Sequence, residues 1–413
     1  MSFRVKLTLL CIALSMGLTQ TTSAEETQLQ QSSAVTLSSL TDNVYQRLPA
    51  HHNELAQQQK INANSALAQA TFADVSTISL NHQNDVVGSN NGMQEWDGTV
   101  AMPLWLPNQK QQQYSLSDKM TAELPAYKQK LRLDAAANVR ELLWNVIQAD
   151  NETKQAYQVW QTSQKLERDV AARVKAGEMA GTERLLAVTN ALDMHSQYLL
   201  KQAELDHALT SYRAITREQN LPINYEEALS DKKVIDQNHP TLNILDQQIN
   251  TLRTKQDLAQ FNGAVNPSLL LGVRHDRGGA QGDQFNTSVG VGISFALDNK
   301  VYRNPTIANA AKELADAEIV RQQLERALNI DLFAQQHALE TKQQQLKLVT
   351  EQDTVTQQYL ALQQRAFNLG EIDLVSLLRS QELANKSNYQ KKALEVDIKR
   401  TIVMINQALG IIL

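Results

Sequence analysis

The sequence has few of the residues from which large compact cores are built. Its 413 residues include one cysteine and 8 prolines, and aromatic residues make up 5% of the chain. Because the cores of large globular domains usually rely on aromatic side chains, these shortages disfavour a compact fold and favour long helices. The one cysteine, Cys11, lies near the N-terminus, so no cysteine follows it.

Basic charge and long apolar runs are also scarce. The formal net charge is −5, with 39 Lys and Arg against 44 Asp and Glu, which gives no reason to expect a nucleic-acid partner. After residue 24 no run approaches the roughly 18 apolar residues of a membrane-spanning helix, so strands would have to cross any membrane. The histidines show no HExxH spacing and no catalytic set stands out. We therefore expect no metal site, no cofactor and no enzymatic activity.

The N-terminal segment, from Met1 to Ala24, has the organisation of a secretory signal peptide. Arg4 and Lys6 precede an apolar stretch over residues 7–18, and the small residues Ser23 and Ala24 follow. This order is typical of a signal peptide cleaved after Ala24, and the apolar stretch is too short to span a bilayer. Because Arg4 and Lys6 would be removed, the mature chain would carry a net charge of 37 − 44 = −7.

The segment FNTSVGVGISFAL, residues 285–297, alternates between apolar and small or polar residues along its whole length. This period of two predicts a strand with one apolar and one polar face. The pattern recurs earlier in the chain at an offset of 193, since DGTVAMPLWL (97–106) aligns with GVGISFALDN (290–299). At the same offset VKAGE (174–178) aligns with FNLGE (367–371). The chain is therefore predicted to be an internal duplication.

Both halves are predicted to have the same order of elements: helix, strand, strand, long helix and returning helix. Segments rich in Gly, Asn and Asp separate the two strands, and a glycine turn separates the two long helices. We expect the first repeat, residues 25–222, to contain a helix at 38–73, strands at 75–83 and 95–106, and a helical hairpin at 108–220. We expect the second repeat, residues 223–413, to contain a helix at 240–264, strands at 268–275 and 284–297, and a helical hairpin at 305–410.

The predicted long helices exceed what the core of a single soluble domain needs. The 65 residues from 305 to 369 would form a helix of roughly 98 Å. In the first half, Pro125 lies inside the helical pattern and removes a backbone donor. We therefore expect a kink or a restart of the helix at Pro125.

The apolar residues of the predicted strands alternate as lipid-facing residues do in membrane barrels. Four strands cannot close a barrel, but three chains would supply twelve, and strands of this length can cross the apolar layer of an outer membrane. The predicted fold class is thus mainly α with a contribution to a transmembrane β-barrel. The expected membrane-facing residues are Trp96, Val100, Met102, Val289, Val291, Ile293 and Phe295.

The order of elements resembles that of the TolC family of outer-membrane efflux proteins, the outer membrane factors, over nearly the whole chain after residue 24. The matching segments are NHPTL, NPSLLLGVRHD, VGVGISFAL and the two turn regions RVKAGEMAGTERLLAVTNAL and RAFNLGEIDLVSLLRSQELAN. The segments WDGTVAMPLWLPNQK and LPAYKQKLRLDAAANVRELLW resemble in particular the members that accompany heavy-metal export pumps.

This resemblance implies a homotrimer with a twelve-stranded barrel in the lipid of the bacterial outer membrane and an α-helical tunnel of twelve helices across the periplasm. It implies that the hairpin turns, with Gly177, Glu178, Gly370 and Glu371, contact a periplasmic adaptor protein. Through the adaptor they would reach an inner-membrane pump of the resistance-nodulation-division type. The chain would be the passive exit duct of a tripartite efflux system.

The gate is where the sequence departs from the family pattern. Six and nine residues after the second turn glycine the family places an acidic pair, but here these positions are Ser376 and Arg379. At the first turn, Glu183 occupies the position equivalent to Ser376. An acidic constriction is therefore not expected. Instead, we expect Arg379 to pair with Glu183, Glu371 or Asp373 as a latch between hairpins, since three unpaired arginines in a narrow pore would repel one another.

Two other functions remain open from the sequence. A periplasmic adaptor or scaffold would also present helical hairpins, although adaptors usually combine one hairpin with β-rich modules that this duplication lacks. An outer-membrane channel for type I secretion would share the whole architecture. Trimers in an outer-membrane fraction would favour a channel, and a soluble monomer would favour a scaffold.

Overall fold

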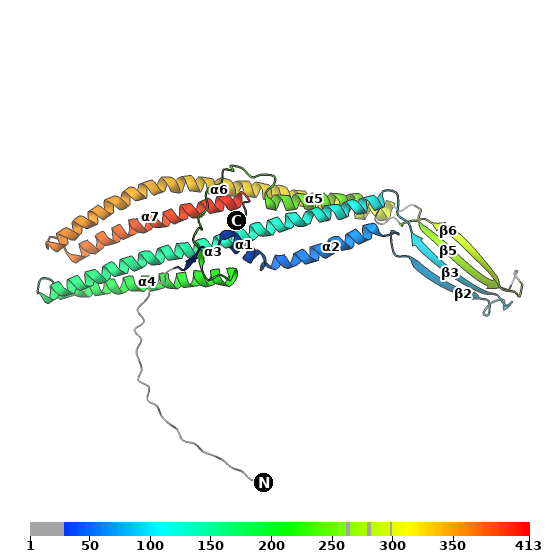
Figure 1. The fold of residues 1–413 in the computed structure, drawn as a ribbon, viewed down its shortest axis with the longest axis horizontal. Coiled ribbons are helices and arrows are strands. Elements are labelled where there is room, and N and C mark those ends of the chain that lie inside the picture. Colours follow the sequence, from blue (N-terminus) through cyan, green and yellow to red (C-terminus); the bar gives the residue numbers. More distant parts are fainter. Residues whose placement is uncertain (1–28, 262–264, 279–281, 298–299) are drawn as a thin grey trace, which may run out of the picture.

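The computed structural model describes residues 29–261, 265–278, 282–297 and 300–413. The predicted signal peptide, residues 1–24, and its cleavage site lie outside these described residues. The molecule is elongated, with a sheet at one end and the turns of two helical hairpins at the other, and the C-terminus lies at mid-length (Figure 1).

Two long helical hairpins make up most of the length of the molecule. In the first, α3 (Gln109–Lys175) leads to α4 (Gly181–Thr216), and in the second α6 (Lys300–Asn368) leads to α7 (Leu374–Ala408). The ends of α3 and α6, and likewise the starts of α4 and α7, are separated by the offset found in the sequence, so the predicted repeat recurs at both turns. The 69 residues of α6 give it a length of roughly 104 Å.

The four long helices lie in the order α4, α3, α7, α6. α4 packs against α3, α3 against α7, and α7 against α6. Nearer the sheet, α5 (Pro240–Ala259) lies between α3 and the first part of α6 (Figure 1). In the half of the molecule nearer the turns, α4 and α6 are therefore the outer helices of the layer.

The main core lies at mid-length, where α1 (Leu37–Tyr45) covers α3 and α4 and where the short β1 (Gln31–Ser32) and β4 (Leu221–Pro222) pair in parallel. Trp144 of α3 is buried, and Tyr212 of α4 is buried with its hydroxyl donating to the Asn220 carbonyl at 3.0 Å. Apolar residues recur every three or four positions along α3, as a helix facing a core requires. The buried ones in this region include Leu131, Ala135, Val139, Leu143 and Val146.

A buried ionic network ties the segment between the repeats to the same core. Arg140 of α3 is 2% exposed, and its Nε and Nη2 lie 2.8 Å and 2.7 Å from the two carboxylate oxygens of Glu227. Arg140 also donates to the Ile411 carbonyl at 2.9 Å, and Asn406 of α7 donates to Glu227 at 3.1 Å. Because every charge in the network has partners, a guanidinium can be buried here without the large cost of an unpaired ion.

The single helix predicted over residues 38–73 is wrong. The structure has α1, then a 3-10 turn η1 (Pro49–His51), then α2 (His52–Gln69). Pro49 accounts for the break, because proline lacks a backbone donor and pushes the preceding residue out of the helical region. Leu48 accordingly has φ −58° and ψ 130°.

α3 does not restart at Pro125, which was one of the two predicted outcomes. The helix runs from Gln109 to Lys175 without a restart. Proline leaves the carbonyl four residues earlier, that of Thr121, without its helical donor. Both Pro125 and Thr121 are exposed, so water can satisfy this carbonyl, while Met120 and Ala126 are buried and hold the helix on either side.

Four strands form one antiparallel sheet in the order β2 (Thr77–Asn84), β3 (Gln94–Pro103), β5 (Ser268–Arg277), β6 (Asn286–Ser294). The central pair joins the two repeats, since Val100 of β3 lies opposite Leu271 of β5. β3 and β6 each end three residues earlier than predicted. In β3 the end coincides with Pro103, which cannot donate to a strand ladder.

Candidate functional site

The sheet separates apolar from polar residues on its two faces. The register aligns Ile78, Val100, Leu271 and Val291 in one row across the four strands. Further residues of this face, Trp96, Met102, Val289 and Ile293, fall in neighbouring rows, and Phe295 follows the end of β6 with the same parity.

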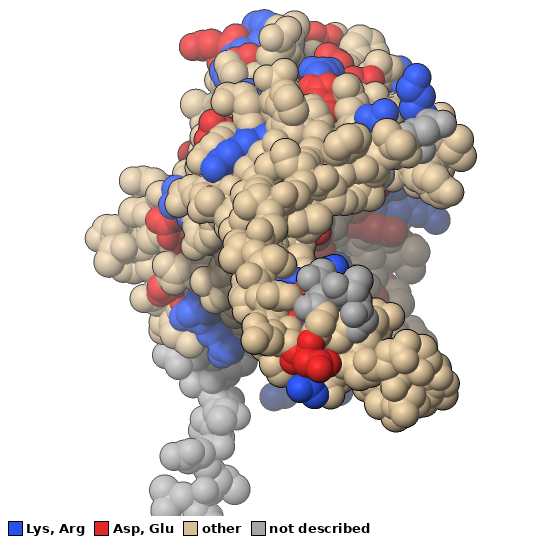
Figure 2. Space-filling model, turned by 90° about the vertical axis from the view of Figure 1, so that its right-hand side faces the viewer, with Lys and Arg blue, Asp and Glu red and all other residues tan. Residues whose placement is uncertain are grey.

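This apolar face is bare in the described part of the chain. Ile78 is 81% exposed and Val291 is 72% exposed. Viewed from the sheet end, most of the surface bears neither basic nor acidic side chains (Figure 2). A continuous apolar surface of this kind marks an interaction site. None of the described helices is both long and apolar enough to cross a membrane.

The opposite face carries the acidic residues of the strands. Arg274 of β5 lies opposite Asp97 of β3, with its Nε 3.2 Å from Asp97 Oδ1 and its Nη2 3.2 Å from Glu95 Oε1. Glycines lie on the same face at the middle of the sheet, where Gly272 is opposite Gly290. This face therefore suits water, whereas the other suits an apolar medium.

Both helical hairpins turn through the same backbone motif. Gly177 and Gly370 have φ of 80° and 77°. In each turn the glycine donates to the carbonyl three residues earlier at 3.1 Å, and the following Glu178 or Glu371 donates to the carbonyl five residues earlier at 2.9 Å. This is the Schellman motif, in which glycine is favoured because it adopts positive φ without a steric cost. The two glutamates are exposed at the end of the molecule far from the sheet.

The helices that return from the two turns start differently. Asp373 is the N-cap of α7, and its carboxylate accepts from the Ser376 backbone N–H at 2.9 Å. Hydrogen bonds from Ser376 lower the pKa of Asp373. Ala180 stands at the equivalent position before α4 and provides no side-chain cap. The two turns therefore share a backbone shape and differ in charge.

An arginine that the sequence patterns did not single out ties the two turns together. Arg173, in the last turn of α3, has its Nη2 2.9 Å from Asn368 Oδ1 and its Nη1 3.3 Å from the Phe367 carbonyl. Its guanidinium also lies over the Phe367 ring at 5.1 Å. The position equivalent to Arg173 in the second repeat is Ala366. This difference between the repeats was the signal in the sequence that could have singled out Arg173. Next to these Arg173 contacts, residues of both hairpins form one apolar cluster: Leu166, Val170, Ala187, Phe367, Leu374 and Leu377.

The predicted latch through Arg379 is not made within the chain. Arg379 is exposed on α7 and has no ion pair within 4.0 Å among the described residues, so it does not pair with Glu183, Glu371 or Asp373 there. Its charge is the smallest of the influences that lower the pKa of Asp373, after the hydrogen bonds from Ser376. Spacing along the helices placed these residues near the two turns but could not tell in which direction each side chain points.

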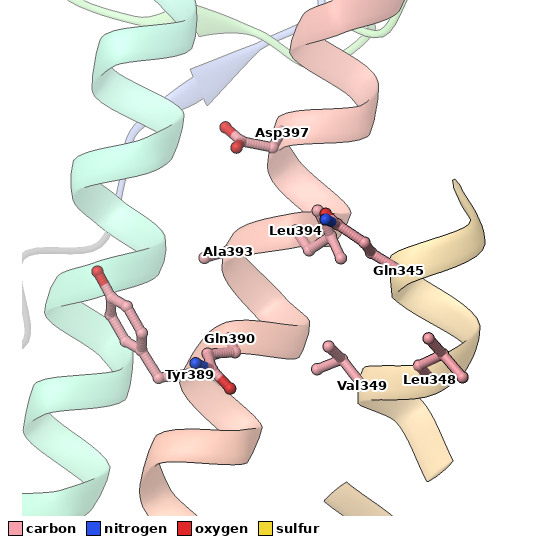
Figure 3. Close-up of a pocket in the computed structure, with 8 residues that line it drawn as sticks. All are labelled: Gln345, Leu348, Val349, Tyr389, Gln390, Ala393, Leu394 and Asp397. Atoms are coloured by element: carbon pink, nitrogen blue, oxygen red, sulfur yellow. The ribbon is translucent and has the colours of Figure 1, made fainter. Parts of the chain in front are cut away.

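A shallow groove of about 420 Å³ runs between α6 and α7. Leu348 and Val349 line its α6 side and Leu394 lines its α7 side, whereas Tyr389 points away toward α3 (Figure 3). Leu348 is 68% exposed. Within the described ranges, no three His, Cys, Asp or Glu side chains are grouped as metal ligands. The apolar lining of the groove suits another helix better than a charged ligand.

The fold is similar to that of solved outer-membrane channels. The CmeC outer membrane channel of Campylobacter jejuni superposes with a TM-score of 0.70 at 12% identity, covering 98% of this chain and 94% of that chain. The outer membrane protein VceC of Vibrio cholerae gives a TM-score of 0.70 at 12% identity, covering 91% and 96%. The open state of the MtrE outer membrane channel of Neisseria gonorrhoeae gives 0.68 at 12% identity, covering 91% and 89%. No protein-family model and no curated protein matches the sequence itself.

Proposed function

We propose that this protein is a TolC-type outer membrane factor, the exit duct of a tripartite efflux system, and that it works as a homotrimer. One observation carries this function. A single chain presents a sheet with a bare apolar face at one end and, at the other end of helices roughly 100 Å long, two exposed turns. Such a molecule can sit in the outer membrane and reach across the periplasm. The chain provides a passage and does no chemistry.

The two faces and the free edges of the sheet support the proposed barrel. β2 and β6 are edge strands, so each has backbone donors and acceptors available to another strand. Strand edges in a membrane must be paired, and a closed barrel pairs them all. Three copies supply twelve strands, with residues such as Val291 toward lipid and Arg274 and Asp97 toward a water-filled interior.

The internal repeat supports a specific contact between neighbouring chains. Within the chain α3 packs against α7, where Arg400 bonds to Gln148 and Arg140 bonds to Gln407. The residue numbers of these pairs sum to 548 and 547. Adding the offset of 193 to residue numbers in α3 gives the equivalent positions in α6. Subtracting it from residue numbers in α7 gives the equivalent positions in α4. The equivalent contact therefore joins α6 of one chain to α4 of the next with the same sum, and such a head-to-tail contact can close into a ring.

Both outer helices carry apolar residues at the spacing that this contact needs. α4 and α6 each have three apolar residues, all at least 51% exposed, that repeat every seven positions. This is the period of a coiled-coil seam. The same contact would cover the groove beside Leu348. The pairs whose residue numbers sum to 547 are Leu185 with Leu362, Leu192 with Val355, and Leu199 with Leu348.

Cysteines at Leu192 and Val355 should crosslink neighbouring chains. The chain has no other cysteine after the signal peptide, so Leu192→Cys combined with Val355→Cys should give covalent trimers on mild oxidation, read on a non-reducing gel. Leu192→Cys with Leu369→Cys is the control, because Leu369 lies four helical turns farther along, about 21 Å in a helix. This control should stay monomeric. Equal crosslinking in both variants would contradict the register.

The turns are the part of the duct best placed to meet a partner in the periplasm. Gly177, Glu178, Gly370 and Glu371 lie at the end farthest from the sheet and are exposed. We assign to them the contact with a periplasmic adaptor, which connects the duct to an inner-membrane pump of the resistance-nodulation-division type. The pump would select the cargo, whether a metal ion, a drug or a protein.

Loss of Arg173 should loosen the turn end of the duct. Arg173→Ala removes two hydrogen bonds and a ring contact between α3 and the end of α6. A loss of about 1.5 kcal/mol would raise the open fraction roughly tenfold, seen as higher resting conductance in planar bilayers. Arg379→Ala removes the same charge from a side chain that has no ion pair with the described residues of its own chain, and should leave the conductance unchanged. The opposite pattern would restore Arg379 as the latch.

Fractionation distinguishes the duct from a periplasmic scaffold. A duct should sediment with outer membranes and run as a trimer after detergent extraction, because its apolar sheet face needs lipid. A soluble monomer in the periplasmic fraction would reject the proposed function and favour a scaffold that presents two helical hairpins.

A further inference from the structure

The sheet face that we assign to lipid ends in a belt of aromatic and basic side chains. This outer belt consists of His82, Trp96, His275, Arg277 and Phe285. His82, Trp96 and His275 form one row across β2, β3 and β5, and Arg277 lies two residues beyond His275 on the same face. The belt lies at the strand ends farthest from the helices and directly follows the last apolar row, which contains Leu80, Val273 and Val289.

The side chains of the outer belt stack on one another. The His82 ring lies 4.1 Å from the Trp96 ring, and the His275 ring lies 4.5 Å from the Phe285 ring. The Arg277 guanidinium lies over the same Phe285 ring at 4.7 Å. A guanidinium that stacks on a ring keeps its N–H groups, which point outward in its own plane, available for an anion. The Nε of Arg277 is buried without a hydrogen-bond partner among the described residues, so the two Nη groups are the donors that an anion would have to reach.

The acids on the strands of this region do not face the belt. Glu95, Asp97 and Asp276 lie on the opposite face of the sheet, where Arg274 partners the first two. Asp85, in the turn after β2, accepts hydrogen bonds from the backbone N–H groups of its own turn at 2.6 Å and 2.9 Å. The strands therefore contribute only basic and aromatic residues to the belt, and Asp283, exposed in the turn between Arg277 and Phe285, is the one described acid beside it that none of these contacts accounts for.

We propose that the outer belt binds the anionic phosphate headgroups of the lipids around the duct. The proposal rests on the proposed function, because it requires the apolar face to lie in a membrane. Amphipathic aromatic rings settle at the headgroup level of a bilayer, and arginine forms strong charge-assisted bonds with phosphate oxygens. A trimer would repeat the belt three times around the barrel. Anionic lipid is thus a ligand that holds the duct at a fixed depth and stabilises the trimer.

The test compares the heat stability of purified trimers with different additives. Parent trimer in detergent receives short-chain phosphatidylglycerol, phosphatidylcholine with the same acyl chains, or inorganic phosphate, and the temperature of dissociation is read on gels. Phosphatidylglycerol should raise this temperature, whereas the other two additives should not. Arg277→Gln combined with His275→Gln should remove most of the shift. Arg277→Lys should keep part of it, and Lys312→Gln, which removes one positive charge from an exposed helix position, should keep all of it.

Three results would overturn the proposal. They are an unchanged phosphatidylglycerol shift in the double variant, an equal shift with phosphatidylcholine, and an equal shift with inorganic phosphate, which would indicate a free-anion site. A parent protein that is not a trimer before any additive is present would refute the proposed function instead, so the two failures are distinguishable.

Discussion

Val291→Arg should sharply reduce the amount of assembled trimer. Val291 lies at mid-height of the apolar face, in the row with Ile78, Val100 and Leu271, and is 72% exposed in the single chain. If that face meets lipid, an arginine near the middle of the bilayer costs about 2–4 kcal/mol per chain. The cost recurs in each of three chains, so the heat-resistant trimer in outer-membrane fractions should nearly disappear.

The control for Val291→Arg needs a position on the polar face at the same height. Ser288 on the same strand is unsuitable because it lies directly opposite Arg274, and a second arginine there would add like-charge repulsion. Ser79 is better, since it lies on the other edge strand opposite Thr99, in the row that contains Gly272 and Gly290. Ser79→Arg should leave most of the trimer intact. Similar losses from both substitutions would argue against a membrane-facing side.

Arg140→Ala should destabilise the mid-length core more than any surface substitution. Arg140 is 2% exposed and binds both carboxylate oxygens of Glu227. Its removal leaves Glu227 as a largely buried charge without its main partner, which typically costs about 3–5 kcal/mol. The free energy of unfolding, measured by denaturant titration of the helical circular dichroism signal, should fall by this amount.

Two further variants separate the network from the charge alone. Arg253→Ala removes an exposed arginine 3.1 Å from Glu318, and should cost about 1 kcal/mol or less. Arg140→Ala combined with Glu227→Ala removes both charges, and should recover part of the loss because no unpaired ion remains. If Arg140→Ala and Arg253→Ala prove equally mild, the network does not hold the core together.

The sequence predicted the features that depend on local periods. Alternation along 285–297 predicted the two faces of the sheet, and the internal repeat predicted equivalent glycine turns at Gly177 and Gly370. These features need only the pleat of a strand, the spacing of a helix and the freedom of glycine at positive φ. The mainly helical fold with a two-faced sheet could therefore be predicted before any tertiary contact was known.

Features that depend on the surroundings of a residue could not be predicted in this way. Pro49 ends a helical run and Pro125 does not. The Thr121 carbonyl, which loses its helical donor to Pro125, is exposed to water, and buried residues on either side of the proline hold the helix in place. The Arg379 latch stays a prediction for neighbouring chains, because whether a carboxylate comes within reach of Arg379 depends on how two hairpins are rotated against each other. Arg140 did leave a signal, since a charged residue stands between Val139 and Leu143 in the apolar stripe of α3.

The order of the strands also constrains the sequence of folding events. β2 with β3, and β5 with β6, are hairpins that can form locally within a few residues of their turns. The central β3–β5 pair joins Val100 to Leu271, which belong to different repeats, so it needs the helices between them to be in place first. Contacts this distant in sequence form slowly, because the entropy of closing the loop must be overcome before they stabilise anything. The newly made chain should therefore carry two separate apolar hairpins for some time, and during that period their exposed apolar faces and unpaired edges make it prone to aggregation.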